Sequence, residues 1–171
     1  METRIKEFAS TWKGYKRDNK KSISLIRYAD DFVILHKDLN RVNEAKEIIE
    51  QWLLEMGLEL NKCKTRITHT LNEYEGNLGF DFLGFTVRQF PQGKNHTGKS
   101  GNKKRLGFKT IIKPNKEKVL THLHKVKEVI KQHKTAPQPA LVTRLNSVIR
   151  GWTNYYSTVC SKETFSYCWD R

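Results

Sequence analysis

The chain has 171 residues, and its 37% hydrophobic and 11% aromatic content is enough for a buried core, which excludes disorder throughout. An excess of 32 Lys and Arg over 18 Asp and Glu gives a net charge of +14 and predicts a polyanionic partner, such as nucleic acid or an anionic membrane surface. No apolar run has the length of a membrane span, nothing resembles a signal peptide, and the three cysteines form no CxxC pair. We therefore expect a cytoplasmic protein with reduced thiols and no membrane partner.

The first strong pattern is an apolar run over residues 22–35, which follows a polar, basic segment at 1–21 that we interpret as a leader. Asp30 and Asp31 interrupt this run in the stretch YADD. Aspartate tolerates the dihedral angles of tight turns, so the run predicts two short strands that form a hairpin. The acidic pair is then expected to project from the bend between them.

A helix is predicted over residues 41–56, where apolar side chains recur at three- and four-residue steps, with Asn40 as its cap and Gly57 as its stop. Further strands are predicted at about 64–70, which is rich in Thr and Ile, and at 80–90. The order strand, strand, helix, strand, strand predicts an α+β fold rather than an alternating parallel sheet.

A basic segment rich in Gly, Lys and Asn occupies residues 91–112, and we interpret it as an exposed loop or hairpin tip followed by a short strand. A helical module is predicted over residues 113–171. Its first helix is expected to begin at Pro114, because proline suits a first helical turn. The second is predicted over 138–150 with Gly151 as its stop, and a third, aromatic-rich helix follows directly.

The adjacent carboxylates of Asp30 and Asp31 favour metal chemistry. Two carboxylates about 4 Å apart repel each other by about 4 kcal/mol at an effective dielectric constant of 20, and a bound cation relieves this repulsion. Carboxylate oxygens suit Mg²⁺, and Mg²⁺ ions at such a site support in-line phosphoryl transfer. An Asp-Asp pair alone is more often a solvated acidic turn, so the surrounding sequence has to decide.

The surrounding sequence resembles a known family. YADD between two apolar strands, then a helix, GLELNKCKT and FDFLGF follow one another as in the second half of a reverse transcriptase palm. The stretches KTIIKPNKEKV and LVTRLNSVIRGWTNYYSTVCSKETFSY are similar to the thumb and maturase-specific domain X of bacterial group II intron reverse transcriptases. The resemblance extends over about residues 22–171. It implies a partial palm of antiparallel strands with one packing helix at 22–90 and an all-α thumb or maturase domain at 113–171.

The family activities are RNA-directed DNA synthesis and assistance in RNA splicing, and the resemblance implies roles for individual residues. Asp30 resembles the metal-binding aspartate of the family and Asp31 its partner, with Mg²⁺ as the cofactor. Core packing is the structural alternative for the FLGF residues, and a solvated strand edge is the alternative for Lys64. Contacts with the incoming nucleotide or the primer are implied for Tyr28, Ala29, Asn61, Lys64, Thr65, Phe82, Leu83 and Gly84.

Basic residues concentrate in 88–134, which holds 14 Lys and Arg against two Glu, a net charge of +12. This surplus exceeds what solubility needs and predicts contact with RNA, which the resemblance implies is group II intron RNA. Candidate RNA contacts are Lys103, Lys104, Arg105, Lys109, Lys113, Lys116, Lys118, Arg150, Asn154 and Tyr155.

The stretch RGWTNYY has two interpretations. Its aromatic side chains beside a cation suit stacking of unpaired bases, but Trp152 and Tyr156 are one helical turn apart and are expected to pack between helices. The intervening residues, candidates for RNA contact, are expected to face outward. Cys160 and Cys168 are expected to be buried thiols.

The sequence departs from the family pattern before YADD. The fingers and the first catalytic aspartate of the family lie there, and this chain has only 27 residues in that place. We therefore expect a C-terminal fragment of the family protein that does not polymerise alone. One alternative is a freestanding RNA-binding maturase-type module without catalysis, and another is an inactive degenerate fragment. In a third, a separately encoded N-terminal half docks on this chain, and the complete protein binds a DNA primer-template.

Overall fold

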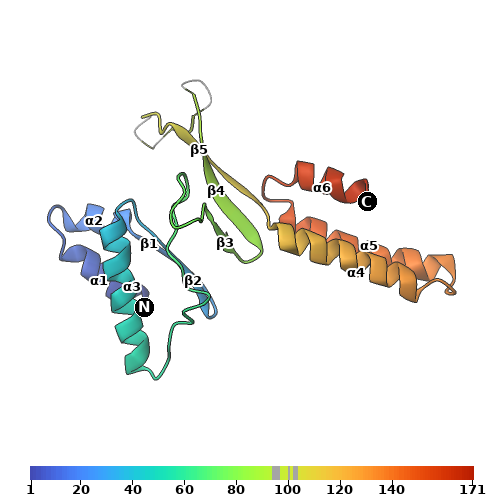
Figure 1. Ribbon diagram of the computed structural model, residues 1–171, viewed down its shortest axis with the longest axis horizontal. Helices are drawn as coiled ribbons and strands as arrows, with labels where there is room; N and C mark the ends of the chain where they lie inside the picture. The colour runs from blue at the N-terminus through green and yellow to red at the C-terminus, as the bar shows by residue number, and fades with distance from the viewer. Residues whose placement is uncertain (94–96, 100, 102–103) are drawn as a thin grey trace. The chain divides into compact units, whose positions relative to one another are not determined.

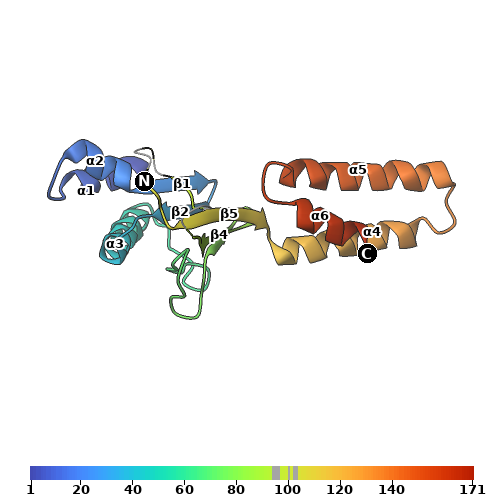
Figure 2. The ribbon, with the colours of Figure 1, turned by 90° about the horizontal axis from the view of Figure 1, so that it is seen from above.

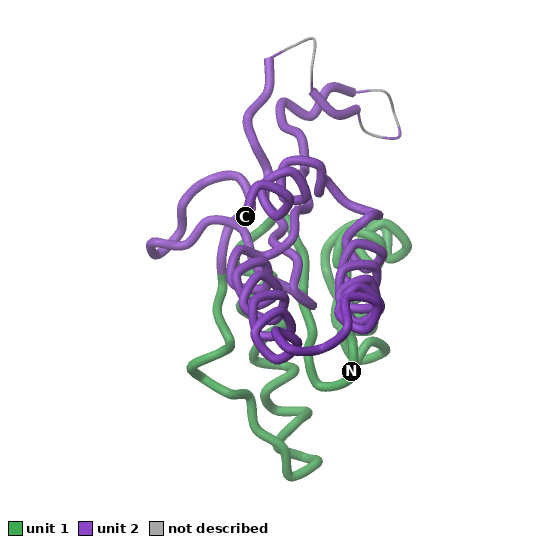
Figure 3. The backbone as a smooth tube through the Cα atoms, turned by 90° about the vertical axis from the view of Figure 1, so that its right-hand side faces the viewer, with its two compact units in different colours: residues 1–67 green, residues 68–171 purple. Residues whose placement is uncertain are grey.

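The computed structural model describes residues 1–93, 97–99, 101 and 104–171. The chain forms two compact units, residues 1–67 and residues 68–171, which Figure 3 distinguishes by colour and which are described separately below. Both units combine helices with small antiparallel sheets, so the predicted α+β class is confirmed. Among the described residues, no helix is both long and apolar enough to cross a membrane.

The predicted hairpin is confirmed in the first unit. β1 and β2 pair in antiparallel fashion from Ser24 opposite Leu35 to Tyr28 opposite Asp31. The basic segment before them, which we interpreted as a leader, forms two short helices. In chain order the unit contains α1 (Glu2–Ser10), α2 (Lys16–Ser22), β1 (Ser24–Tyr28), β2 (Asp31–Leu35) and α3 (Leu39–Glu55), shown in Figure 1.

The predicted helix at 41–56 is α3, but its cap was wrong. Asp38, not Asn40, is the N-cap, and its side chain accepts a hydrogen bond from the Asn40 backbone N–H at 2.9 Å. Asn40 therefore lies in the first turn. Gly57 ends the helix as predicted: it has a φ of +73°, and the Leu58 N–H bonds to the Leu53 carbonyl in a Schellman-type ending.

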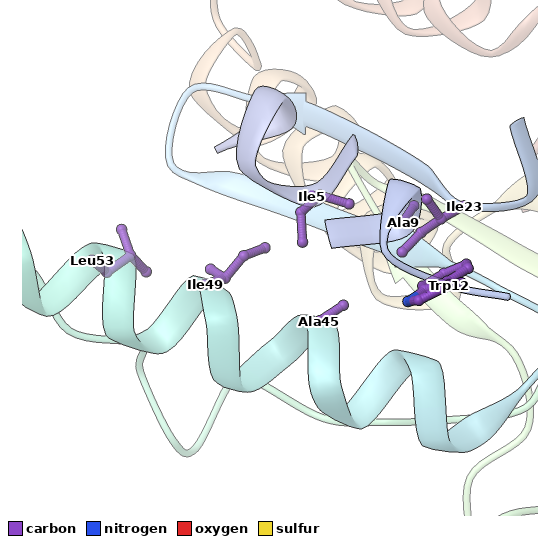
Figure 4. Close-up of a cluster of buried hydrophobic side chains, with 7 residues drawn as sticks. All are labelled: Ile5, Ala9, Trp12, Ile23, Ala45, Ile49 and Leu53. Atoms are coloured by element: carbon purple, nitrogen blue, oxygen red, sulfur yellow. The ribbon is translucent and has the colours of Figure 1, made fainter. Parts of the chain in front are cut away.

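α1 supplies part of the core of the first unit, because its apolar side chains face those of α3. Along α3 the buried positions recur every four residues, which places them on one face of the helix. Figure 4 shows these side chains turned toward those of α1 and toward the start of the hairpin. The buried cluster consists of Ile5, Ala9, Trp12, Ile23, Ala45, Ile49 and Leu53.

The second unit contains a three-stranded antiparallel sheet of β3 (Phe80–Phe82), β4 (Phe85–Pro91) and β5 (Phe108–Pro114), in that order. The sequence predicted one strand over 80–90, and this was wrong because a two-residue turn divides it into a hairpin. The short strand predicted before residue 113 is confirmed as β5.

The strand predicted at 64–70 is absent from this fully described stretch. A turn held by Asn61 begins the segment, and an irregular extended chain follows, with a single bridge between His69 and Leu78. The β-branched residues favour a strand only where a neighbouring strand offers a ladder of hydrogen bonds, and none runs beside them here.

Three helices complete the second unit. Figures 1 and 2 show α4 and α5 side by side, with α6 next to α4. Pro114 ends β5 instead of opening the helix. Asn115 caps α4, because its side-chain oxygen accepts hydrogen bonds from the backbone N–H groups of Glu117 and Lys118 at 2.8 and 3.3 Å. The helices are α4 (Lys116–Gln132), α5 (Gln138–Tyr156) and α6 (Lys162–Trp169).

α5 passes through Gly151 without a break, so the predicted stop at this glycine was wrong. A glycine inside a helix costs about 0.5–1 kcal/mol relative to alanine, and the packing of the aromatic residues that follow it outweighs this cost.

The prediction that both C-terminal cysteines are buried was also wrong: Cys160 is exposed and Cys168 is half-buried.

Candidate functional site

The YADD hairpin turns over two residues. Pairing of Tyr28 with Asp31 leaves Ala29 and Asp30 as the loop, and Ala29 has a φ of +52°. A positive φ at the first loop residue is typical of type II′ turns, where glycine is usual, so the alanine is held in a strained conformation. The turn is thus fixed by the ladder behind it rather than by the preference of its own residues.

Asp30 and Asp31 are both exposed, one in the loop and the other as the first residue of β2. Their oxygens are the ligands that Mg²⁺ prefers, and solvent access leaves room for the phosphate and water ligands that this ion keeps. Within the described parts of the chain, no group of three or more His, Cys, Asp or Glu side chains could hold a metal ion. The two carboxylates could supply oxygen ligands to a Mg²⁺ ion. The Tyr28 side chain beside it is 64% exposed.

The post-helix motif is a turn. The Asn61 side-chain oxygen accepts hydrogen bonds from the backbone N–H groups of Cys63 and Lys64 at 3.1 and 3.2 Å. The backbone N–H of Thr65 donates to the Asn61 carbonyl at 2.8 Å. Asn61 therefore shapes the turn, while the Lys64 side chain is exposed and Thr65 is half-buried.

The FLGF stretch forms the turn between β3 and β4. Phe82 pairs with Phe85, and the two residues between them, Leu83 and Gly84, have φ values of +50° and +79°. Two consecutive positive values define a type I′ hairpin turn. A Cβ atom on Gly84 would lie 2.8 Å from the Tyr156 hydroxyl oxygen, so this turn needs glycine for its backbone and for space.

The end of α5 holds the FLGF turn. The Tyr155 hydroxyl donates to the Leu83 carbonyl at 2.7 Å, and the Tyr156 hydroxyl donates to the Gly84 carbonyl at 3.1 Å. The Phe85 ring stacks on Tyr155 and meets Tyr156 edge to face, with ring centres 5.1 Å apart in both pairs. The structure thus joins predicted site residues that are 72 positions apart, a link that no local sequence pattern could reveal.

The packing roles predicted for RGWTNYY are confirmed in part. Tyr156 is buried, and Trp152 stacks on His122 of α4 with ring centres 4.3 Å apart and planes 8° apart. Asn154 and Tyr155 are exposed as expected, but the Tyr155 hydroxyl and one side of its ring are already occupied. Burial, and secondarily the charge of Lys125, lower the pKa of His122.

Most of the candidate RNA contacts lie on exposed positions of the second unit. Lys113 is half-buried and forms an ion pair with Glu163 at 2.8 Å, which RNA would have to displace. Lys103 lies outside the described residues. The exposed candidates are Lys104, Arg105, Lys109, Lys116, Lys118, Arg150, Asn154 and Tyr155.

Two family models match the chain. The model of the reverse transcriptase (RNA-dependent DNA polymerase) matches residues 2–87, half of the chain, and so includes α1, α2 and the YADD hairpin. The model of the group II intron, maturase-specific domain matches residues 119–171, which cover most of α4 and all of α5 and α6. No curated protein matches the chain.

The first match covers half of the chain, including the exposed YADD turn, and the chain therefore belongs to the reverse transcriptase family. The two matches together identify a reverse transcriptase and maturase of the group II intron type, as the sequence resemblance predicted.

Replacement of Gly84 by alanine tests the FLGF turn. We expect Gly84→Ala to destabilise the second unit by about 2–3 kcal/mol, from backbone strain and from the close approach to Tyr156. Gly76→Ala is the matched control, since Gly76 has a φ of +74° but open space around its Cβ position, and it should cost only about 1 kcal/mol. Hydrogen exchange of the Asn115 N–H, which bonds to the Gly84 carbonyl, measures the difference. Equal costs for the two variants would contradict the steric argument.

A pH dependence follows from buried His122. Its lowered pKa means that the folded state binds fewer protons than the unfolded state below pH 6.5. The stability gained by keeping this imidazole neutral is therefore fully present above about pH 6.5 and is lost as the pH falls from there through the lower pKa of the folded state. We expect the melting temperature to fall by a few degrees between pH 7.5 and pH 5, and by less in His122→Phe. His124→Phe, on an exposed position of the same helix, is the control for the substitution itself. An unchanged pH slope in His122→Phe would refute the assignment.

Proposed function

We propose that the chain binds group II intron RNA through its second unit and takes part in intron splicing as a maturase. The observation that carries this proposal is the net charge of +12 on residues 88–134. This segment overlaps the start of the maturase-specific match, which begins at residue 119. Cations of this density attract phosphates and release counterions on binding. Residues 113–171 would act as the thumb-like domain X and residues 22–90 as part of a palm, with 91–112 as the basic connection.

The proposed RNA contacts differ in what they can offer. Lys104, Arg105 and Lys109 precede the helices, and Lys116 and Lys118 lie on the first turn of α4. Arg150 and Asn154 add an exposed cation and an amide on α5. Lys103 and Lys113 are also proposed as RNA contacts, but the ion pair between Lys113 and Glu163 has to break before Lys113 can bind a phosphate. Tyr155 offers an exposed ring face, while its hydroxyl positions the FLGF turn.

The YADD hairpin is proposed to be one part of a polymerase active site. Asp30 and Asp31 would hold Mg²⁺, which when bound supplies charge stabilisation for phosphoryl transfer. Tyr28 and Ala29 would lie near the primer terminus. The post-helix residues Asn61, Lys64 and Thr65 would approach the incoming nucleotide, and Phe82, Leu83 and Gly84 would approach the primer backbone. The support is the exposure of the acidic pair and the two firmly held turns.

The chain is proposed not to polymerise by itself. Across the residues that the structure describes, no third acidic ligand joins the pair, and two carboxylates leave a polymerase metal site incomplete. Such a ligand, together with the template-binding groups, would have to come from a further segment or from a separately encoded N-terminal half, which would also complete a DNA primer-template site. The freestanding RNA-binding module remains the alternative, since it needs no such completion.

Salt titration tests the RNA proposal. If about five cations contact phosphates, the logarithm of the association constant for a group II intron transcript should fall with the logarithm of salt concentration at a slope of about −4. The double variant Lys109→Gln/Lys116→Gln should reduce this slope by about 1.4, whereas Lys13→Gln, an exposed lysine of the first unit, is the control. If the association constant of the wild type does not change with salt concentration, the proposal that these cations bind RNA phosphates is refuted.

Primer extension tests the catalytic part. With Mg²⁺ and an RNA template, the purified chain should give no template-directed product. Product formation that disappears in Asp30→Asn would show that the chain is a complete polymerase and would reject both the incomplete site and the RNA-binding-only alternative. If a separately encoded half restores synthesis, Asp30→Asn should abolish the restored activity while leaving RNA binding intact.

A further inference from the structure

A hollow of about 550 Å³ lies between α4 and α5, the two helices that Figure 2 shows side by side. Three exposed cations line it: Lys118 and Lys125, seven residues apart on α4, and Arg144 on α5. Residues seven apart lie on the same helical face, so the two lysines look toward the same neighbour. No acidic residue is among the lining residues, and α5 contains none. The hollow is therefore a cationic site without an internal counter-charge.

Gly151, in the C-terminal half of α5, lines the same hollow. A Cβ atom built on Gly151 would meet nothing within 4 Å, so the folded chain leaves open space above this exposed residue. The glycine thus adds room to the hollow beside its cations.

Aromatic groups supply the other side of the hollow. Trp152 is held against His122 by the parallel stack, and Tyr155 is 51% exposed with one ring face on Phe85. The site thus combines a fixed aromatic lining with cations and open space. Phosphates alone would need only the cations, whereas an unpaired nucleotide uses all three, because its base can stack while its phosphate is neutralised.

The hollow continues along α5. Arg144 and Ser147 also line a second hollow that reaches His133 and Pro139 at the connection between α4 and α5. Two adjoining hollows that share Arg144 and Ser147, with cations from both helices, suit an extended strand rather than a single small anion.

The geometry points to a binding site for single-stranded RNA in the groove between α4 and α5, with Lys118, Lys125 and Arg144 on the phosphates and one nucleotide seated over Gly151. This inference rests on the proposed RNA-binding function and narrows it to a place and to an unpaired strand. A duplex would present phosphates but no free base face to the aromatic lining.

The test measures binding of the full chain to fluorescently labelled octauridylate and to a twelve-base-pair RNA duplex by anisotropy. Gly151→Leu fills the groove without changing charge and should weaken octauridylate binding at least tenfold, with no loss of melting temperature and less than a twofold effect on the duplex. Asn146→Leu is the matched control on α5, exposed and outside both hollows. Lys125→Gln/Arg144→Gln should reduce the salt slope for octauridylate by about 1.4, and the equally charged control Lys127→Gln/Lys134→Gln should not.

Four outcomes are decisive. Octauridylate binding by Gly151→Leu at the level of Asn146→Leu would overturn the groove while leaving RNA binding in place. Equal weakening of octauridylate and duplex would overturn the preference for an unpaired strand. If Gly151→Leu fails to fold, an unchanged salt slope in Lys125→Gln/Arg144→Gln overturns the groove by itself. If the wild-type chain binds none of the three RNAs (octauridylate, the duplex and the intron transcript), the proposed RNA-binding function is refuted, and so is the proposed binding site in the groove.

Discussion

The second unit depends on two backbone carbonyls and the two phenols that meet them. The Leu83 and Gly84 carbonyls point out of a tight turn and accept hydrogen bonds from the Tyr155 and Tyr156 hydroxyl groups. The Gly84 bond is partly buried, where a carbonyl without a donor would be costly. Because the donors sit on the last turn of α5, the hairpin of β3 and β4 and the helical module are tied at one point. The Asn115 N–H, at the junction of β5 and α4, donates a second hydrogen bond to the Gly84 carbonyl.

Local sequence signals predicted the elements that local forces decide. The hairpin around Asp30, the helix that ends at Gly57 and the strand before Pro114 all follow from patterns within a dozen residues. The failures arose where a distant or neighbouring group competes. Asp38 took the cap because its side chain reaches the first free N–H groups, and Gly151 did not stop α5 because Trp152 and Tyr156 pack beyond it.

The candidate site was predictable as chemistry but not as geometry. The acidic pair and the basic surplus can be read from residue types, because charge and oxygen ligands do not depend on the fold. The attachment of FLGF to α5 could not be read, since it joins residues 72 positions apart through side-chain hydroxyl groups that any exposed tyrosine also carries. The same holds for the groove: its cations are visible in the sequence, but the alignment of Arg144 with Lys125 comes from the pairing of two helices.

The length of α5 has a mechanical consequence. Its 19 residues make a rod of about 28 Å, with the FLGF turn fastened at one end and the connection to α4 at the other. Two hydrogen bonds and the ring contacts of Phe85 join the turn to the last turn of this helix, so the direction of α5 sets the orientation of the small hairpin.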